Sequence, residues 1–289
     1  MSKEVVSHRT CFDRVVPTHL DPHALAHQAA ISKYVSTVKA ASKVAKPDAT
    51  FRDHVAAIGN IGELHATHPI TIARMAMVDR SKWEPGHTLT CRFLDGDDFQ
   101  KGKVIEKAKI WEDHANVHID FGSAADAEVR ISFVADSGSW SAVGKDCLLT
   151  SYFHKNKPTM NFGWLRDDTD DKEYERVVVH EFGHALGCIH EHQSPKEHLH
   201  WDTAAVYAEF SGPPNNWSKA DIDSNILEKY SPEGITASRF DRKSIMLYQF
   251  DASLFTDHKA TPLNFELSKE DKIMIGQLYQ SAKAVKETA

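Results

Sequence analysis

The segment from Val177 to Glu191 constrains this chain more than any other, because it carries the spacing of a metal-binding helix. It reads V-V-V-H-E-F-G-H-A-L-G-C-I-H-E and contains the pattern H-E-x-x-H-x-x-G-x-x-H. Residues four apart lie on one face of an α-helix, so His180 and His184 can direct their imidazoles at one metal ion. Glu181 directly follows His180 and is expected beside the metal, where its carboxylate can deprotonate a metal-bound water.

The pattern predicts that this helix ends at Gly187, because glycine readily takes the left-handed conformation that ends a helix and turns the chain. His190 follows the turn and can return as a third ligand. Three protein nitrogens leave one position open for water, as in a catalytic zinc site. The alternative is an ordinary helix with three surface histidines. The spacing favours one Zn²⁺ ion held by His180, His184 and His190.

The composition is that of a soluble globular protein. The chain has 289 residues, 41% hydrophobic and 26% charged, which suffices for one large domain or two smaller ones. The formal net charge of −7 argues against nucleic acid as the main partner. The apolar runs are too short for a transmembrane helix, so no membrane partner is expected. The oligomeric state stays open.

The first residues contain no apolar core of a signal peptide. We therefore expect a cytoplasmic protein, or one secreted by a route that is not encoded here; ordinary secretion is the alternative if a signal has been removed. The cysteines are far apart and form no C-x-x-C pair: Cys11, Cys91, Cys147 and Cys188. Free thiols in a reducing compartment are the favoured interpretation, and their even number leaves disulfides open.

Hydrophobic patterning predicts an α+β fold. Strands are expected at residues 88–94, 117–121, 128–134 and 159–165, an edge segment at 138–144, and helices at 99–114 and 172–186. This alternation implies a mixed α/β sheet with an edge strand ahead of the metal motif. After His190 the pattern is irregular and mostly helical, with helices expected at 201–210, at 218–230 and from the capping box Ser268–Asp271 to about residue 279.

Two regions are predicted from these elements. Residues 1–82 carry no catalytic pattern and contain helices expected at 21–46 and 53–65. They are interpreted as a helical extension, a pro-segment or a partner-binding region. Residues 83–283 form the predicted catalytic domain, with an upper subdomain at 83–187 and a lower subdomain at 188–283, and residues 284–289 form a tail.

A second motif lies downstream, where residues Ser244–Tyr248 read S-I-M-L-Y. Together with the metal motif it resembles the astacin-like branch of the metzincins, which are zinc peptidases. In that family this turn places a methionine under the zinc site and a tyrosine beside the metal, which implies these roles for Met246 and Tyr248. A phenol in that position can donate a hydrogen bond to an oxyanion as it forms. The resemblance covers about residues 82–283 and implies a metzincin-like fold.

Two further features are similar to astacins. Glu191 matches an acid characteristic of the branch, where it also contacts the mature N-terminus. The segment of Trp140, Ser141, Ala142, Val143 and Gly144 is similar to the family's upper-rim strand, which pairs with the substrate backbone. An exposed edge strand can accept one more strand through its unpaired N–H and C=O groups. An ordinary protected edge is the alternative.

The sequence also departs from the astacin pattern. Astacins carry two disulfides in the catalytic domain, but Ser139 stands where one of those cysteines lies and no cysteine follows Cys188. Leu247 stands where the family usually has histidine. Some metzincins are held latent by a Cys or Asp of the pro-segment that binds zinc, and Cys11 and Asp13 are candidates for such a ligand.

The expected function is a zinc-dependent endopeptidase that cleaves proteins or peptides. Glu181 acts as the general base for metal-activated water, and Tyr248 stabilises the oxyanion. The alternative is a non-catalytic, zinc-stabilised module that binds a peptide or protein in the same cleft. A third interpretation keeps the chemistry but restricts it to one intracellular protein substrate.

Overall fold

The computed structural model describes residues 11–14 and 76–280, except residues 123, 136, 213–214, 231–234 and 238. All of them belong to one compact unit, made of Met1–Val15 and Ile72–Ala289. The helices predicted at 21–46 and 53–65 and the tail at 284–289 lie outside the described residues. Within the described part, no helix is long and apolar enough to cross a membrane.

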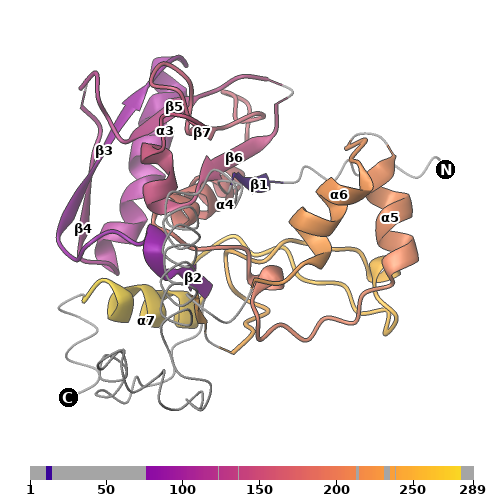
Figure 1. Cartoon of the computed structure of the whole chain (residues 1–289). Helices are drawn as coiled ribbons and strands as arrows, with labels where there is room; N and C mark the ends of the chain where they lie inside the picture. Colours follow the sequence, from indigo (N-terminus) through magenta and orange to yellow (C-terminus); the bar gives the residue numbers. More distant parts are fainter. Residues whose placement is uncertain are drawn as a thin grey trace, which may run out of the picture. The chain divides into compact units, whose positions relative to one another are not determined.

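A mixed six-stranded sheet lies on one side of this unit (Figure 1). In spatial order its strands are β1 (Cys11–Arg14), β6 (Ser139–Ala142), β7 (Met160–Asn161), β5 (Val129–Ser132), β3 (His87–Phe93) and β4 (Val117–Asp120). β6 and β7 are antiparallel, and the other neighbours are parallel. The prediction of a mixed α/β sheet is thereby confirmed. A second, two-stranded sheet pairs β2 (Ala76–Val78) with β8 (Ile235–Ala237).

The strand predicted at 159–165 is shorter than expected, since only Met160–Asn161 form β7. Polar side chains take the backbone groups that a longer ladder would use. The Asn161 amide donates to the carbonyls of Val134 and Gly138 at 3.1 and 2.6 Å. Gly163 N–H donates to Ser139 Oγ at 3.1 Å. The chain therefore leaves the sheet after Asn161.

Helix α3 (Asp98–Ala108) begins at a capping box, in which Asp97 Oδ1 accepts from Gln100 N–H at 2.8 Å and Gln100 Oε1 accepts from Asp97 N–H at 3.1 Å. It continues as the 3₁₀ helix η2 (Lys109–Asp113), so the helix predicted at 99–114 narrows in its last turns. Lys107, near its end, donates to Asp171 and Glu175 of α4. These ion pairs join the two helices side by side.

The central helix α4 (Asp171–Ala185) is capped by Asp170, whose carboxylate accepts from Lys172 N–H at 2.9 Å. All residues from Val177 to Ala185 are buried. A helix that is buried all round has no solvent face. The alternative of an ordinary helix with surface histidines is therefore wrong. The core around α4 is filled by large buried side chains, which include Leu89, Trp111, Ile131, Phe162, Tyr174 and Phe182.

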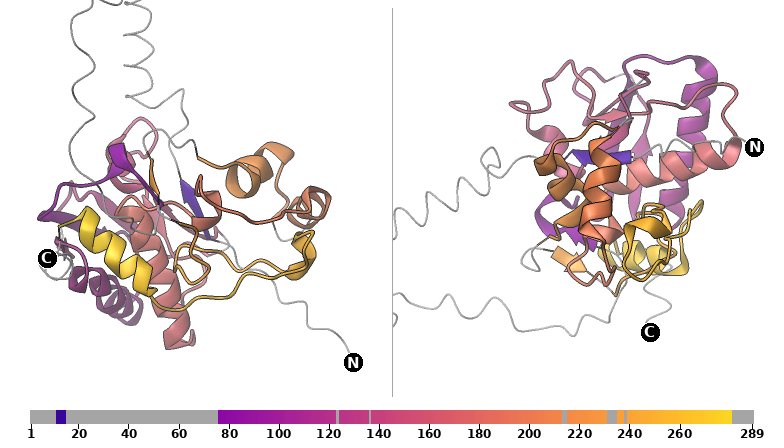
Figure 2. Two further views of the ribbon diagram at one scale, coloured as in Figure 1. Left: turned by 90° about the horizontal axis from the view of Figure 1, so that it is seen from below. Right: turned by 90° about the vertical axis from the view of Figure 1, so that its right-hand side faces the viewer.

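The chain after α4 is mostly irregular, as predicted, with short helices. These are η4 (Glu191–Gln193), α5 (Thr203–Ser211), α6 (Lys219–Ile222), η5 (Asp223–Leu227), η6 (Ala252–Leu254) and α7 (Lys269–Leu278). α5 and α6 lie next to each other and away from α7 (Figures 1 and 2). The sheet, the buried helix and this irregular part confirm the predicted α+β class.

The single helix predicted at 218–230 is divided. α6 widens into η5, a turn of π-helix, and ends at Leu227. Ser224 Oγ and Asn225 Nδ2 both donate to the Asp221 carbonyl, at 3.2 and 2.8 Å. Such side-chain bonds compete with the α-helical ladder. The segment after η5 is thereby free to contact the metal centre.

Candidate metal centre

The predicted metal-binding helix ends in the geometry that its glycine requires. Gly187 has φ +99° and its N–H donates to His184 O at 2.7 Å. The next N–H, of Cys188, donates to Gly183 O at 3.0 Å. These two bonds form a Schellman motif, which satisfies the last carbonyls of the helix and reverses the chain. The turn carries His190 back towards the end of α4.

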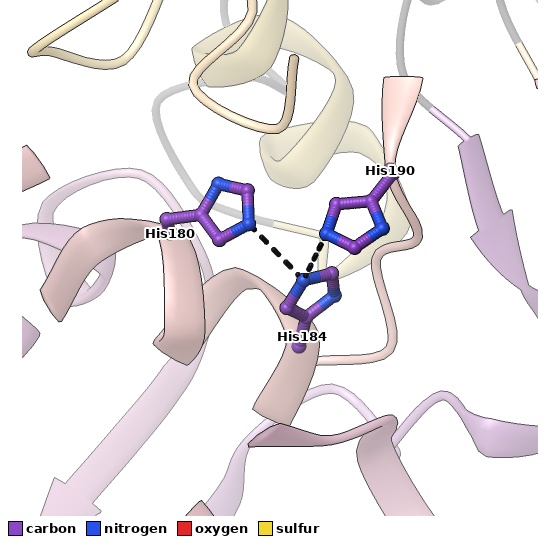
Figure 3. Close-up of side chains that lie close together, drawn as sticks. All are labelled: His180, His184 and His190. Carbon is purple, nitrogen blue, oxygen red and sulfur yellow. Dashed lines mark hydrogen bonds between the residues drawn. The ribbon is translucent and has the colours of Figure 1, made fainter. Parts of the chain in front are cut away.

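The three predicted ligands come together in the interior (Figure 3). Nε2 of His184 lies 3.2 Å from Nε2 of His180 and 3.0 Å from Nε2 of His190. All three residues are buried, and their ligand atoms lie within 4.8 Å of one another. This is the one group of three such side chains found among the described residues. The triad is therefore able to hold a metal ion.

Each of these histidines has its other ring nitrogen bonded to an acceptor. Nδ1–H of His180 donates to Ile245 O at 2.8 Å, Nδ1–H of His184 to Cys188 O at 2.8 Å, and Nδ1–H of His190 to Gln193 Oε1 at 3.4 Å. Because an oxygen of this kind only accepts, Nδ1 carries the proton and Nε2 keeps its lone pair.

The electrostatics of the triad favour the same protonation state. Burial lowers the pKa of His184 to about 4 and holds the pKa of His180 and His190 well below their usual range. Neutral imidazoles are the form that binds a metal. A donor set of three neutral nitrogens, with one position left over, fits Zn²⁺.

The two predicted catalytic side chains lie at the triad. Glu181 is buried on α4, next to His180 in the chain. The Tyr248 ring centroid lies 4.1 Å from the His190 ring and 5.7 Å from the His180 ring. The Tyr248 main chain is held by Thr261, whose hydroxyl donates to Tyr248 O at 2.6 Å. The phenol ring thus covers one side of the three imidazoles.

The Met-turn, residues Ser244–Tyr248, packs against α4. Met246 is fully buried, and a Cβ added at Gly183 would lie 2.5 Å from its sulfur. Gly183 stands between the two helical ligands, so the turn touches the helix at the metal centre. The close approach needs glycine at this position, a requirement that the sequence pattern did not reveal.

Glu191 joins the metal loop to the same turn. Its N–H donates to Met246 O at 2.9 Å, and its Oε1 accepts from Asp241 N–H at 2.7 Å. Burial raises the pKa of the Glu191 carboxyl well above its usual range. The predicted supporting role of Glu191 therefore has a geometric basis in these two bonds.

The predicted substrate-binding segment forms β6 and the turn that follows it. All four residues of β6 are buried, as are Val143 and Gly144. β6 is not the outermost strand, because β1 pairs with it in parallel, with Phe12 opposite Trp140 and Asp13 opposite Ser141 (Figure 1). The backbone edge that was expected to be exposed is thus occupied by an N-terminal segment of the same chain.

The sequence reading missed two supporting residues. Asp271 lies in the capping box of α7, and its carboxylate also accepts from Ser244 Oγ and Ile245 N–H, both at 2.8 Å. Gln193 is the partner of His190. The capping box was a signal for Asp271, but only its local role could be predicted. No pattern pointed to Gln193.

The cysteines of the described part are not joined. Cys91, Cys147 and Cys188 are free and buried. Burial raises the pKa of all three thiols above their usual value. They pack as small apolar side chains, and the side chain of Cys11 lies outside the described part.

A mixed sheet, a buried helix with three converging imidazoles and a methionine turn beneath them define a zinc metallopeptidase of the metzincin type. The family model of the astacin peptidases, described as Astacin, matches residues 76–286. The chain belongs to the astacin family.

Two solved structures of myroilysin are similar to this chain. The first, "Structure of myroilysin", is 39% identical with a TM-score of 0.68, over 71% of this chain and 98% of its own. The second, "Crystal structure of myroilysin", is 37% identical with a TM-score of 0.54, over 69% of this chain and 86% of its own. None of the curated proteins matches the chain.

Proposed function

We propose that this chain is an endopeptidase that uses one zinc ion held by His180, His184 and His190. The convergence of three Nε2 atoms, each on a ring whose Nδ1–H is already bonded, is the observation that carries the proposal. Membership of the astacin family supports it. The substrates are proteins or peptides.

The roles of the neighbouring side chains follow from their chemistry. When bound, zinc supplies Lewis acidity, which acidifies water and polarises a carbonyl oxygen. The Glu181 carboxylate accepts the proton of the attacking water and passes it to the leaving amine. The Tyr248 phenol donates a hydrogen bond to the carbonyl oxygen as negative charge develops on it. Met246 and Glu191 keep the turn and the metal loop in register.

The substitution Glu181→Gln tests this assignment. Glutamine preserves the shape but cannot take the proton, and general base catalysis contributes roughly 10²–10⁴-fold. We expect the variant to bind zinc as the wild type does, measured by atomic absorption, and to lose cleavage of a peptide library by about this factor. Equal activity of the two proteins would refute the role of Glu181.

The competing function is a zinc-stabilised module that binds a peptide without cleaving it. Both functions require zinc, so metal content does not separate them. Cleavage of casein or gelatin does, if it disappears on chelation and returns with zinc. The presence of Glu181 and Tyr248 at the triad favours the enzyme.

We also propose that the N-terminal segment restrains the enzyme, which selects the pro-segment among the interpretations of residues 1–82. The pairing of β1 with β6 supports this, because a strand has only two edges and β7 takes the other edge of β6. A substrate that adds to β6 must first displace β1. Whether Cys11 or Asp13 also binds zinc stays a prediction.

The double substitution Phe12→Pro and Asp13→Pro tests this restraint. Proline lacks the N–H that a ladder bond needs, and each lost bond costs about 1 kcal/mol. A weakening of this size exposes β6 about tenfold more often, so peptide cleavage should rise by a similar factor. The same two changes combined with Glu181→Gln provide the control, which should stay inactive. An unchanged rate in the first variant contradicts the restraint.

A further inference from the structure

We infer that Gln193 is a positioning residue for His190, an inference that rests on the proposed zinc site. The other two histidines donate Nδ1–H to main-chain carbonyls, of Ile245 and Cys188. Nδ1–H of His190 instead donates to a side-chain oxygen, Gln193 Oε1, at 3.4 Å. The orientation of the third imidazole therefore depends on the identity of one side chain, which a substitution can change.

The amide of Gln193 can face His190 in one orientation only. Its Nε2 donates to Ser224 O at 2.7 Å and to Glu228 O at 3.3 Å, so both amide hydrogens are used. Turning the amide over would point its oxygen at two carbonyl oxygens and its N–H₂ at the donor Nδ1. Gln193 is 2% exposed, so water cannot replace these partners cheaply. The side chain thus presents an acceptor to His190.

His190 has more need of such a partner than the other ligands. His180 and His184 lie on α4, where the helix directs their side chains to one face. His190 lies outside the helix in extended conformation, with φ −61° and ψ 135°. Gln193 follows within one 3₁₀ turn, closed by Gln193 N–H donating to His190 O at 3.0 Å. The turn and the side-chain bond together set the direction of the ring and the tautomer that leaves Nε2 for the metal.

Gln193 also connects the metal loop to the segment from Ser224 to Tyr230. Tyr230 N–H donates to Gln193 O at 3.0 Å, in addition to the two amide bonds. This segment contains the end of the π-helix η5. The widened turn presents the carbonyls of Ser224 and Glu228 to one amide group, which explains how an irregular segment distant in sequence takes part in the metal site.

Three variants separate positioning from packing. Gln193→Met keeps the volume and removes the acceptor and both donors. Gln193→Glu keeps an acceptor for His190 but loses the two donated bonds. Gln100→Met is the matched control, because Gln100 is another buried glutamine, 5% exposed, whose amide bonds Leu165 O and Asp97 N–H in α3 and not the metal site. Each protein is prepared metal-free, and its zinc affinity is measured by competition with a chelator of known affinity.

We expect Gln193→Met to weaken zinc binding by about 10–100-fold, the usual effect of losing a partner of a ligating histidine. Gln193→Glu should bind zinc at least as tightly as the wild type, because a carboxylate is a stronger acceptor, yet unfold at lower urea concentration, because its charge is buried beside two carbonyls. Gln100→Met should lose stability and keep its zinc affinity. With Co²⁺ in place of zinc, the visible spectrum should change for Gln193→Met and not for Gln100→Met.

Several outcomes would overturn the inference. One is unchanged zinc affinity of Gln193→Met, and another is an equal loss in Gln193→Met and Gln193→Glu, which would indicate packing alone. If Gln193→Met does not fold, Gln193→Asn, whose shorter side chain cannot reach His190 from the same backbone, must show the loss. A wild-type protein that takes up no zinc would refute the proposed function and this inference together. Stoichiometric uptake with no effect of Gln193→Met would refute this inference alone.

Discussion

Asp271 connects helix α7 to the Met-turn under the metal centre, and its burial leads to a pH-dependent stability. The carboxylate accepts from Ser244 Oγ at 2.8 Å, Ile245 N–H at 2.8 Å and Ser268 N–H at 2.9 Å. Burial raises the pKa of Asp271 from 3.8 to about 6, although these three hydrogen bonds act in the opposite direction. Desolvation of the charged form therefore outweighs the bonds that it accepts.

The magnitude follows from linkage between protonation and folding. At about 1.4 kcal/mol per pKa unit, a rise from 3.8 to about 6 corresponds to about 3 kcal/mol. Because the folded pKa lies above the unfolded one, this stability is present below pH 3.8 and is lost as the pH rises through about 6. About 2 kcal/mol of the loss falls between pH 4.5 and 7.5.

The substitution Asp271→Asn isolates this effect, since asparagine carries no titrating proton. Urea unfolding of the metal-free wild type and variant at pH 4.5, 6 and 7.5 yields the difference in their free energies of unfolding. We expect the wild type to lose about 2 kcal/mol relative to the variant across this range. Groups common to both proteins cancel in the difference.

Asp171→Asn is the matched control on a different surface. Its hydrogen bond to Lys103, with Lys107 on the other oxygen, lowers the pKa of Asp171. Its contribution is therefore present above pH 3.8 and lost as the pH falls below it, so the corresponding difference should stay nearly constant from pH 4.5 to 7.5. A flat difference for Asp271→Asn, or one that grows with pH in favour of the wild type, would refute the reasoning.

Three further results are expected. Tyr248→Phe should lower turnover and leave zinc content intact, because it removes the phenol hydrogen bond and no ligand; loss of zinc in that variant would indicate a structural role instead. Gly144→Ala should lower the free energy of unfolding by about 3 kcal/mol or more, because Gly144 has φ +49° and a Cβ there would lie 1.9 Å from Ser81 O. The control Gly102→Ala, in α3 with open space around it, should raise that free energy by about 1 kcal/mol in the same urea titration. Chelation of zinc should lower the melting temperature of the wild type, since a ligand at 100 times its dissociation constant contributes about 2.7 kcal/mol to the folded state; an unchanged melting temperature would contradict the proposed metal site.

Much of the fold could be predicted because its signals are local. Alternation of apolar residues located β3, β4 and β5 within one or two residues, and capping boxes located the starts of α3 and α7. The prediction at 159–165 was too long and the helix at 218–230 was divided, in both cases because side chains bond backbone groups. Such competition depends on which side chain reaches which carbonyl, and periodicity does not report it.

The sequence by itself determined the three histidines, Glu181 and the turn at Gly187. Their geometry depends on helical periodicity and on one glycine conformation, which are set by residues within a few positions of one another. The tertiary structure alone decided that Gln193 faces His190, that Asp271 holds the Met-turn and that β1 occupies the free edge of β6. These contacts join segments that are distant in the chain or depend on one buried side-chain orientation. Packing, and not local backbone preference, brings such groups together.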